Sequence, residues 1–149
     1  RHIHRANEIK QELNSSKLKV HLHSSNKQVN SNTDIYLVDT FGETKSFLKL
    51  SKTAFMGKSI YAKGGQNPLE AARLGNRIVH GPHIKNFEEV YDFLKKQGVS
   101  TKINSFKDLE KLVPKFDRKK NYSQQIIKKL SYTGNQILLN NEKEINRYF

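Results

Sequence analysis

The sequence contains no cysteine, and this absence excludes two kinds of site at once. The chain has neither a disulfide framework nor a zinc site built from thiolates, which is compatible with a reducing compartment. No apolar run approaches the 18 residues that a membrane-spanning helix needs. The sequence also lacks a G-x-G-x-x-G fingerprint, an aromatic RNA-recognition motif and a cluster of Asp and His residues at metal-ligand spacing. These absences argue against disulfide scaffolds, membrane spans and dinucleotide-binding domains.

Acidic residues are also few, since 14 Asp and Glu face 27 Lys and Arg, giving a net charge of +13. The surplus predicts an anionic partner, either nucleic acid, acidic lipid or a phosphorylated substrate, although a Lys-rich surface can also be merely solvated. A length of 149 residues is that of one ordinary domain with a real core. We therefore expect a single α/β domain over 1–149, and, because the chain begins at Arg1-His2 without Met, a fragment of a larger protein.

Apolar residues alternate between helical and strand spacing along most of the chain. Helices are expected at 4–14, 43–50, 68–74, 87–96 and 106–112, strands at 18–23, 34–38, 53–56, 77–80 and 99–103, and two C-terminal helices within 117–149, broken near Thr133-Gly134. Strand 34–38 is apolar almost throughout, which is typical of a buried parallel strand. The alternation predicts a Rossmann-like parallel sheet flanked by helices, with its strand-to-helix loops at the carboxyl edge where ligands bind.

The segment 64–70 (GGQNPLE) is the most informative of these loops. Gly64 and Gly65 allow the backbone to approach a ligand closely. Asn67 suits a helix N-cap, and Glu70 has the spacing of a capping-box carboxylate. A glycine loop before a helix N-terminus presents free N–H groups and the positive end of a dipole, which suits a phosphate. The alternative is a well-capped helix and nothing more.

Capping-box spacing recurs in the two neighbouring loops. Thr40 and Glu43 follow strand 34–38, and Asn86 and Glu89 follow strand 77–80. Capping accounts for these polar residues, but it explains neither the glycine pair nor the run 81–83 (Gly-Pro-His). We therefore expect a ligand site where the three loops meet.

Taken in order, these loops resemble the C-terminal half of the 3-deoxy-D-manno-octulosonate (Kdo) transferases, over nearly the whole chain. Segment 64–70 is close to the family's Gly-Gly-His-Asn-Pro-Leu-Glu signature, and segment 39–43 (DTFGE) resembles its Asp-Thr-Met-Gly-Glu. Further matches are Arg1-His2 to the end of a Pro-Arg-His turn, Gly57-Lys58-Ser59 to Gly-Gly-Ser, Gly81-Pro82-His83 to Gly-Pro-His, and Asn86-Phe87 to Asn-Phe. Their order and compatible spacing make the resemblance specific.

The resemblance implies the nucleotide-sugar domain of a two-domain GT-B glycosyltransferase. The donor is then CMP-Kdo, and the acceptor is the lipid A precursor at the cytoplasmic face of the bacterial inner membrane, an anionic surface. The general base of the family lies in its N-terminal domain, so we expect no catalytic residue in this chain, and neither a metal nor a nucleic acid as partner. The expected donor-nucleotide site consists of Arg1, His2, Thr40, Gly42, Glu43, Gly64, Gly65, Asn67, Glu70, Pro82 and His83.

Each expected role has a plain alternative. Arg1 would pair with phosphate or the sugar carboxylate, the N–H groups of the glycine loop would hold the phosphate, and Glu70 would accept hydrogen bonds from the ribose. Glu43 and Glu70 could instead only cap helices, and His83 could be bonded to backbone.

The chain departs from the family at three positions, where Phe41, Lys58 and Gln66 replace Met, Gly and His. Gln66 cannot titrate near neutral pH. The strand that the family has before Arg1-His2 is central in a doubly wound sheet, so we expect strand 18–23 or 53–56 to have an unpaired edge.

Several alternatives remain open at this point. His21 and His23 have a spacing that can bind metal, but an exposed strand face is the simpler interpretation. The basic tail, 118–120 and 128–129, faces either anionic lipid or solvent. Rival functions are a GT-B domain for another nucleotide sugar, a basic nucleic-acid-binding α/β module, or an inert half of a cleft.

Overall fold

The structure is a computed structural model that describes residues 3–61 and 64–116 together with positions 128 and 132. Apart from positions 128 and 132, the predicted tail helices within 117–149 lie outside the described residues, as do the predicted site residues Arg1 and His2. The chain divides into two compact units, 1–44 and 45–149. The single domain expected over 1–149 stays a prediction.

The first unit contains one helix and two short parallel strands. Its elements are the 3-10 turn η1 (Ile3–Arg5), α1 (Ala6–Ser15), β1 (Val20–Leu22), the 3-10 turn η2 (His23–Ser25) and β2 (Ile35–Leu37). Val20 lies opposite Ile35, and Leu22 lies opposite Leu37. Among the described residues of this unit, Ala6 alone is buried.

The apolar strand 34–38 is therefore not the buried strand that its composition predicts. No residue of β2 is buried, and the Tyr36 side chain is 38% exposed. The reason is that β2 pairs with β1 alone among the described residues, so its side chains have few neighbours. Tyr36 instead organises the two strand histidines, because its ring stacks on His21 with centroids 5.2 Å apart and its hydroxyl lies 2.8 Å from His23 Nδ1. Both histidines thus pack on a tyrosine.

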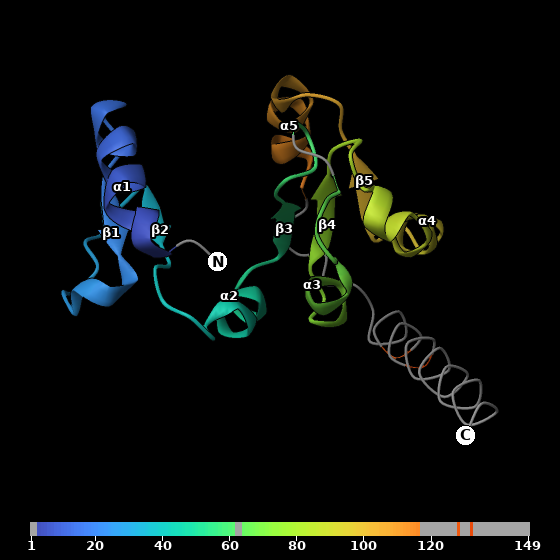
Figure 1. The fold of residues 1–149 in the computed structure, drawn as a ribbon, viewed down its shortest axis with the longest axis horizontal. Helices are drawn as coiled ribbons and strands as arrows, with labels where there is room; N and C mark the ends of the chain where they lie inside the picture. The colour runs from blue at the N-terminus through green and yellow to red at the C-terminus, as the bar shows by residue number, and fades with distance from the viewer. Residues whose placement is uncertain (1–2, 62–63, 117–127, 129–131, 133–149) are drawn as a thin grey trace. The chain divides into compact units, whose positions relative to one another are not determined.

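The second unit is built on a three-stranded parallel sheet in the order β3-β4-β5 (Figure 1). Its elements are α2 (Thr44–Leu50, which begins at the unit boundary), β3 (Thr53–Met56), α3 (Leu69–Arg73), β4 (Arg77–His80), the 3-10 turn η3 (Lys85–Phe87), α4 (Glu88–Lys96), β5 (Ser100–Lys102), α5 (Phe106–Leu112) and the 3-10 turn η4 (Val113–Lys115). Each strand-helix-strand passage returns the chain to a neighbouring parallel strand, as in βαβ units.

The central strand β4 is buried on both faces. Ile78 and Val79 are fully buried, and because successive strand side chains point to opposite faces, they enter two different clusters. Ile78 packs with residues of α3 and α4, whereas Val79 packs with Ile103 and against apolar residues of α5. Helices therefore cover both faces, which confirms the predicted α/β class with a parallel sheet flanked by helices.

Several boundaries agree closely with the sequence prediction. Strands 53–56 and 77–80 and helix 106–112 are found with the predicted bounds, and the other predicted elements up to 116 are present with ends shifted by one or two residues. Within the described residues β1 pairs only with β2 and β3 only with β4. Both strands that the sequence singled out thus have one edge without a partner strand in that part of the chain.

Candidate functional site

The strand register brings the ends of the three strands of the second unit level with one another. Met56 lies opposite His80, and His80 lies opposite Lys102. Each of these is the last residue of its strand. The loops that follow β3 and β4 therefore leave the sheet at the same carboxyl edge, where open α/β sheets bind ligands.

Ser59 joins these two loops. Its Oγ accepts a hydrogen bond from Gly81 N at 2.8 Å, and its carbonyl oxygen accepts one from His83 N at 2.9 Å. A Cβ on Gly81 would lie only 2.0 Å from that carbonyl oxygen, so no other residue fits there. The close approach of two backbones explains why glycine begins the run 81–83.

The glycine pair has a similar explanation within the chain. Gly64 and Gly65 have φ angles of +102° and +68°, which strain any residue with a side chain. A Cβ on Gly64 would meet Asn86 Nδ2 at 2.9 Å, and one on Gly65 would meet His83 O at 3.0 Å. The two glycines thus allow the loop after β3 to lie against the loop after β4, which brings the predicted residues Gly64, Gly65 and His83 together.

The loop 64–67 contains several backbone N–H groups that make no hydrogen bond within the described residues. Within the described part of the chain, the N–H groups of Gly64, Gly65, Gln66 and Asn67 donate to no other group, whereas Gly64 O accepts from Asn86 N at 3.4 Å. Successive unused backbone N–H groups in a turn are able to bind an anion. The predicted phosphate role of this loop stays a prediction.

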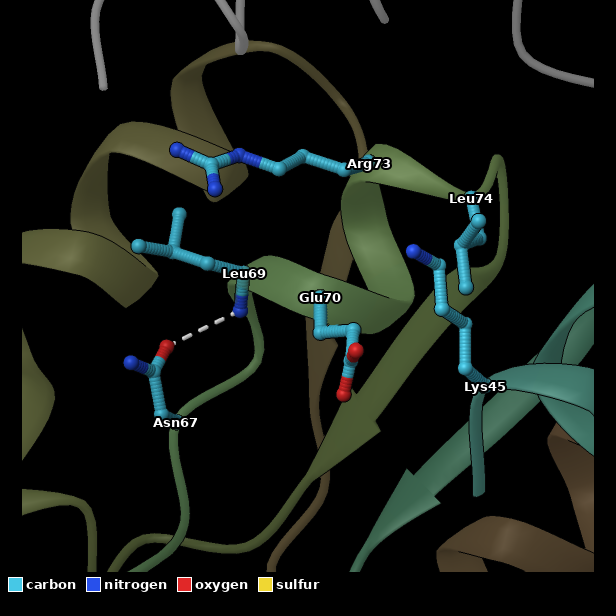
Figure 2. Close-up of a pocket in the computed structure, with 6 residues that line it drawn as sticks. All are labelled: Lys45, Asn67, Leu69, Glu70, Arg73 and Leu74. Atoms are coloured by element: carbon cyan, nitrogen blue, oxygen red, sulfur yellow. Dashed lines mark hydrogen bonds between the residues drawn. The ribbon is translucent and has the colours of Figure 1, made fainter. Parts of the chain in front are cut away.

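The capping box predicted for Asn67 and Glu70 does not form. Asn67 Oδ1 accepts a hydrogen bond from Leu69 N at 3.0 Å, but the N-cap of α3 is Pro68 and not Asn67 as predicted (Figure 2). The Glu70 carboxylate completes no box, since it is exposed and makes no hydrogen bond within the described residues. The interpretation of Glu70 as only a cap is therefore wrong, and its carboxylate is free to meet a ligand.

The other two predicted boxes are absent. Thr40 Oγ1 is buried without a hydrogen-bond partner, and α2 begins only at Thr44. Asn86 lies inside the turn η3, one residue before the N-cap of α4, and the N-cap residue makes no side-chain bond. The chain has a true capping box at Ser105 and Asp108, where both reciprocal hydrogen bonds form.

All the predicted site residues of the second unit except Gly65 line one of two pockets. Asn67 and Glu70 border a pocket of about 480 Å³ together with Lys45, Leu69, Arg73 and Leu74 (Figure 2). Gly64, Pro82 and His83 border a pocket of about 570 Å³ together with Ile84, Lys85, Asn86 and Glu88. The short loop from Gly64 to Asn67 contributes to both.

Two cations at the Glu70 pocket were not predicted. Lys45 reaches it from the start of α2, and Arg73 from the end of α3, where its guanidinium points away from the Glu70 carboxylate (Figure 2). None of the three forms an ion pair within the described residues. Two positive charges against one negative charge make this pocket suitable for an anion. The only sequence signal was the overall basic charge, which does not single out these positions.

The predicted residues of the first unit have their own surroundings. Gly42 has a φ of +85° and is exposed, and Glu43 is half-buried. Nearby, both oxygens of Asp39 accept hydrogen bonds from Ser24, one from its N–H at 2.9 Å and one from its hydroxyl at 2.5 Å. Hydrogen bonding to Ser24 lowers the pKa of the Asp39 carboxyl.

Two wider properties complete the description. Among the described residues, no helix combines the length and apolar character needed to cross a membrane. In the same residues, no group of three His, Cys, Asp or Glu side chains lies close enough to hold a metal ion.

Comparison with known proteins shows relatives of this chain. The chain is 32% identical over 149 residues to the 3-deoxy-D-manno-octulosonic acid transferase of Haemophilus influenzae, covering 99% of this chain and 34% of that protein. It is 34% identical over 105 residues to the transferase of the same name from Rickettsia prowazekii, covering 68% of this chain and 22% of that protein. The chain thus spans about a third or less of the length of these curated relatives. No protein-family model matches it.

A solved structure has the same fold. The crystal structure of the C-terminal CMP-Kdo binding domain of WaaA from Acinetobacter baumannii aligns with a TM-score of 0.70 and 26% sequence identity. The alignment covers 75% of this chain and 58% of that one.

Proposed function

We propose that this chain, which belongs to the Kdo transferase family, binds the donor CMP-Kdo for transfer of Kdo to the lipid A precursor. The observation that carries the proposal is the loop from Gly64 to Asn67. Its N–H groups are unused within the described residues, and it borders two pockets. The A. baumannii neighbour, whose fold this chain shares, is named for binding CMP-Kdo.

The chemistry of the transfer fits such a loop. The bond between the anomeric carbon of Kdo and a phosphate oxygen breaks, negative charge grows on the departing CMP, and the sugar gains oxocarbenium character. Preorganised donors aimed at that phosphate stabilise the transition state. We assign this role to the N–H groups of Gly64, Gly65 and Asn67, with the positive charges of Lys45 and Arg73 close by.

We assign the remaining donor-binding roles to side chains that border the pockets. The Glu70 carboxylate has no partner within the described residues and would accept hydrogen bonds from the two ribose hydroxyls. Pro82 and His83 border the second pocket and would form its rim. Gln66 stands where the family has His, so no proton transfer near neutral pH passes through it.

Several predictions extend this proposal beyond the second unit. The donor-binding roles of Arg1, His2, Thr40, Gly42 and Glu43 stay predictions from the resemblance. The leaving phosphate would need no metal, and the general base would come from the N-terminal domain of the full transferase. The acceptor, the cytoplasmic face of the inner membrane and its anionic surface belong to the same proposal.

A titration with CMP tests the site directly. We expect the backbone amide resonances of the Gly64–Asn67 loop and of His83 to shift, because the loop borders both pockets and His83 borders one of them. CMP should bind more tightly than UMP or GMP. Shifts confined to other parts of the chain would overturn the assignment, and a preference for UMP or GMP would favour a GT-B domain for another nucleotide sugar. Oligonucleotide binding with a steep salt dependence would favour the nucleic-acid module.

Glu70→Ala tests the ribose role. Loss of the proposed charged hydrogen bonds should weaken CMP binding about tenfold, which corresponds to about 1.4 kcal/mol. Thermal stability should stay unchanged, since the carboxylate makes no hydrogen bond within the described residues. Glu89→Ala, an exposed carboxylate on α4 that borders neither pocket, is the matched control. Equal CMP affinity in both variants would remove Glu70 from the site.

A further inference from the structure

The phenol of Tyr91 reaches from α4 to the glycine loop. Tyr91 Oη donates a hydrogen bond to Gln66 O at 2.8 Å, across 25 residues of sequence. The Tyr91 side chain is only 1% exposed, and its ring packs in the cluster that contains Ile78 and Leu94. On one side the ring meets the His80 imidazole, with centroids 4.2 Å apart. Close packing of the ring therefore fixes the position of the hydroxyl.

The hydrogen bond determines the direction of one backbone donor. A peptide group is planar, and in its trans form the carbonyl oxygen and the following N–H point in opposite directions. The described residues contain no cis peptide bond. Because Gln66 O is held toward the buried Tyr91, the N–H of Asn67 in the same peptide group points away from it. This N–H is among the unused donors of the loop.

We propose that Tyr91 is a positioning residue that keeps the Gln66–Asn67 peptide oriented so that the Asn67 N–H is presented to the phosphate of the bound nucleotide. This inference rests on the proposed donor-binding function and adds to it a residue that touches no ligand. Hydrogen bonds polarise one another in a chain, so donation to Gln66 O also makes the Asn67 N–H a stronger donor.

A buried hydroxyl requires a hydrogen-bond partner. Burying a hydroxyl without a partner is costly, and phenylalanine would fill the same space in the core without that cost. Burial raises the pKa of the Tyr91 phenol to about 12, so the group stays a donor at any physiological pH. The loop after β4 is also held by a buried side chain, because His80 Nδ1 donates a hydrogen bond to Gly81 O at 2.8 Å.

The test is Tyr91→Phe, which removes one oxygen atom and keeps the ring. Tyr61→Phe is the matched control, because Tyr61 is 81% exposed and its hydroxyl makes no hydrogen bond within the described residues. In the ligand-free chain, Tyr91→Phe should shift the Asn67 backbone ¹⁵N resonance, because the Gln66–Asn67 peptide group loses the hydrogen bond that Gln66 O accepts. CMP should then bind about three- to tenfold more weakly. Tyr61→Phe should change none of these.

A second control separates positioning from a general loss of stability. Leu94 lies on the same helix and in the same cluster, and Leu94→Val should lower the unfolding midpoint without changing the Asn67 resonance or the CMP affinity. An unshifted Asn67 resonance in Tyr91→Phe would overturn the positioning role. So would a loss of CMP affinity in Leu94→Val equal to that in Tyr91→Phe. Absence of CMP binding by the unmodified chain would instead refute the donor-binding function, while the shift of Asn67 in the free chain would still report on the peptide.

Discussion

The two units contain parallel strands of similar apolar character with very different burial. In the first unit β1 and β2 have no buried residue, whereas in the second unit three of the four residues of β4 are buried. The difference follows from the neighbours. β4 pairs on both edges and has helices on both faces, whereas each strand of the first unit pairs with a single strand within the described residues. An apolar strand is buried only when other elements cover it.

The comparison has a consequence for stability. A sheet of two strands is at best marginally stable alone, whereas three strands packed against helices can hold a core. We therefore expect backbone amides of β4, such as those of Ile78 and Val79, to exchange more slowly than those of Val20 and Leu22. Local opening of the first unit should precede unfolding of the second.

The largest expected effect comes from Gly81→Ala, which would remove the greater stability expected of the second unit. The new Cβ would lie 2.0 Å from Ser59 O, which is backbone and cannot move aside as a flexible side chain would. We expect a loss of about 3 kcal/mol or more in the free energy of unfolding, as for severe overpacking. Urea unfolding, monitored by hydrogen exchange at the Ile78 and Val79 amides, measures this loss of free energy.

Gly57→Ala is the control for this change. Nothing lies within 4 Å of its added Cβ, and Gly57 does not have a positive φ. Its free energy of unfolding should differ little from that of the unmodified chain. A similar loss in both variants would show that the contact between Gly81 and Ser59 is not what makes glycine necessary.

A pair of isoleucine substitutions sharpens the comparison between the units. Ile78→Ala removes a fully buried side chain from β4 and should cost about 2–5 kcal/mol through lost burial and the cavity left behind. Ile35→Ala removes a half-buried side chain from β2 and should cost clearly less, because part of that surface already meets water. Chemical denaturation of both variants gives the difference. Equal costs would mean that β2 is as well packed as β4.

The comparison also shows what could be predicted from the sequence. Strands 53–56 and 77–80 and helix 106–112 were predicted with their observed bounds because apolar spacing and flanking glycines are local signals. The burial of strand 34–38 was predicted wrongly, because burial depends on partners elsewhere in the chain. The absent boxes at Thr40 and Asn86 show a further limit, since capping spacing is common and only some instances begin a helix.

The candidate site also contains residues that could be predicted from the sequence and residues that could not. Gly64, Gly65 and Asn67 were recognisable because a resemblance to a family signature covers them. Lys45 and Tyr91 were not, since each reaches the loop from a distant helix through tertiary packing. The glycine pair was interpreted as a means of ligand approach. The structure adds that its immediate neighbour is the loop after β4.

The smallest expected effect is a pH dependence confined to the second unit. His80 is 3% exposed, is faced by the Tyr91 ring and lies in the field of Lys95 and Lys102. Burial lowers the pKa of His80 below its ordinary value of 6.5, the two lysines lower it further, and the hydrogen bond to Gly81 opposes them in part. The folded protein therefore resists protonation at a pH where the unfolded chain accepts it.

The sign follows from linkage. The unfolded state binds more protons between pH 6.5 and the lowered folded pKa, so the contribution of His80 to stability is complete above pH 6.5 and declines as the pH falls through that window. In the first unit Asp39 has a lowered pKa, so its contribution is lost only below its ordinary value of 3.8. His80→Asn can keep a side-chain N–H near Gly81 O while removing the titration. We expect the urea midpoint of the second unit to fall as the pH is lowered below 6.5 in the unmodified chain and to stay flat in His80→Asn. Parallel declines in both proteins would assign the titration to a group other than His80, because only His80 differs between them.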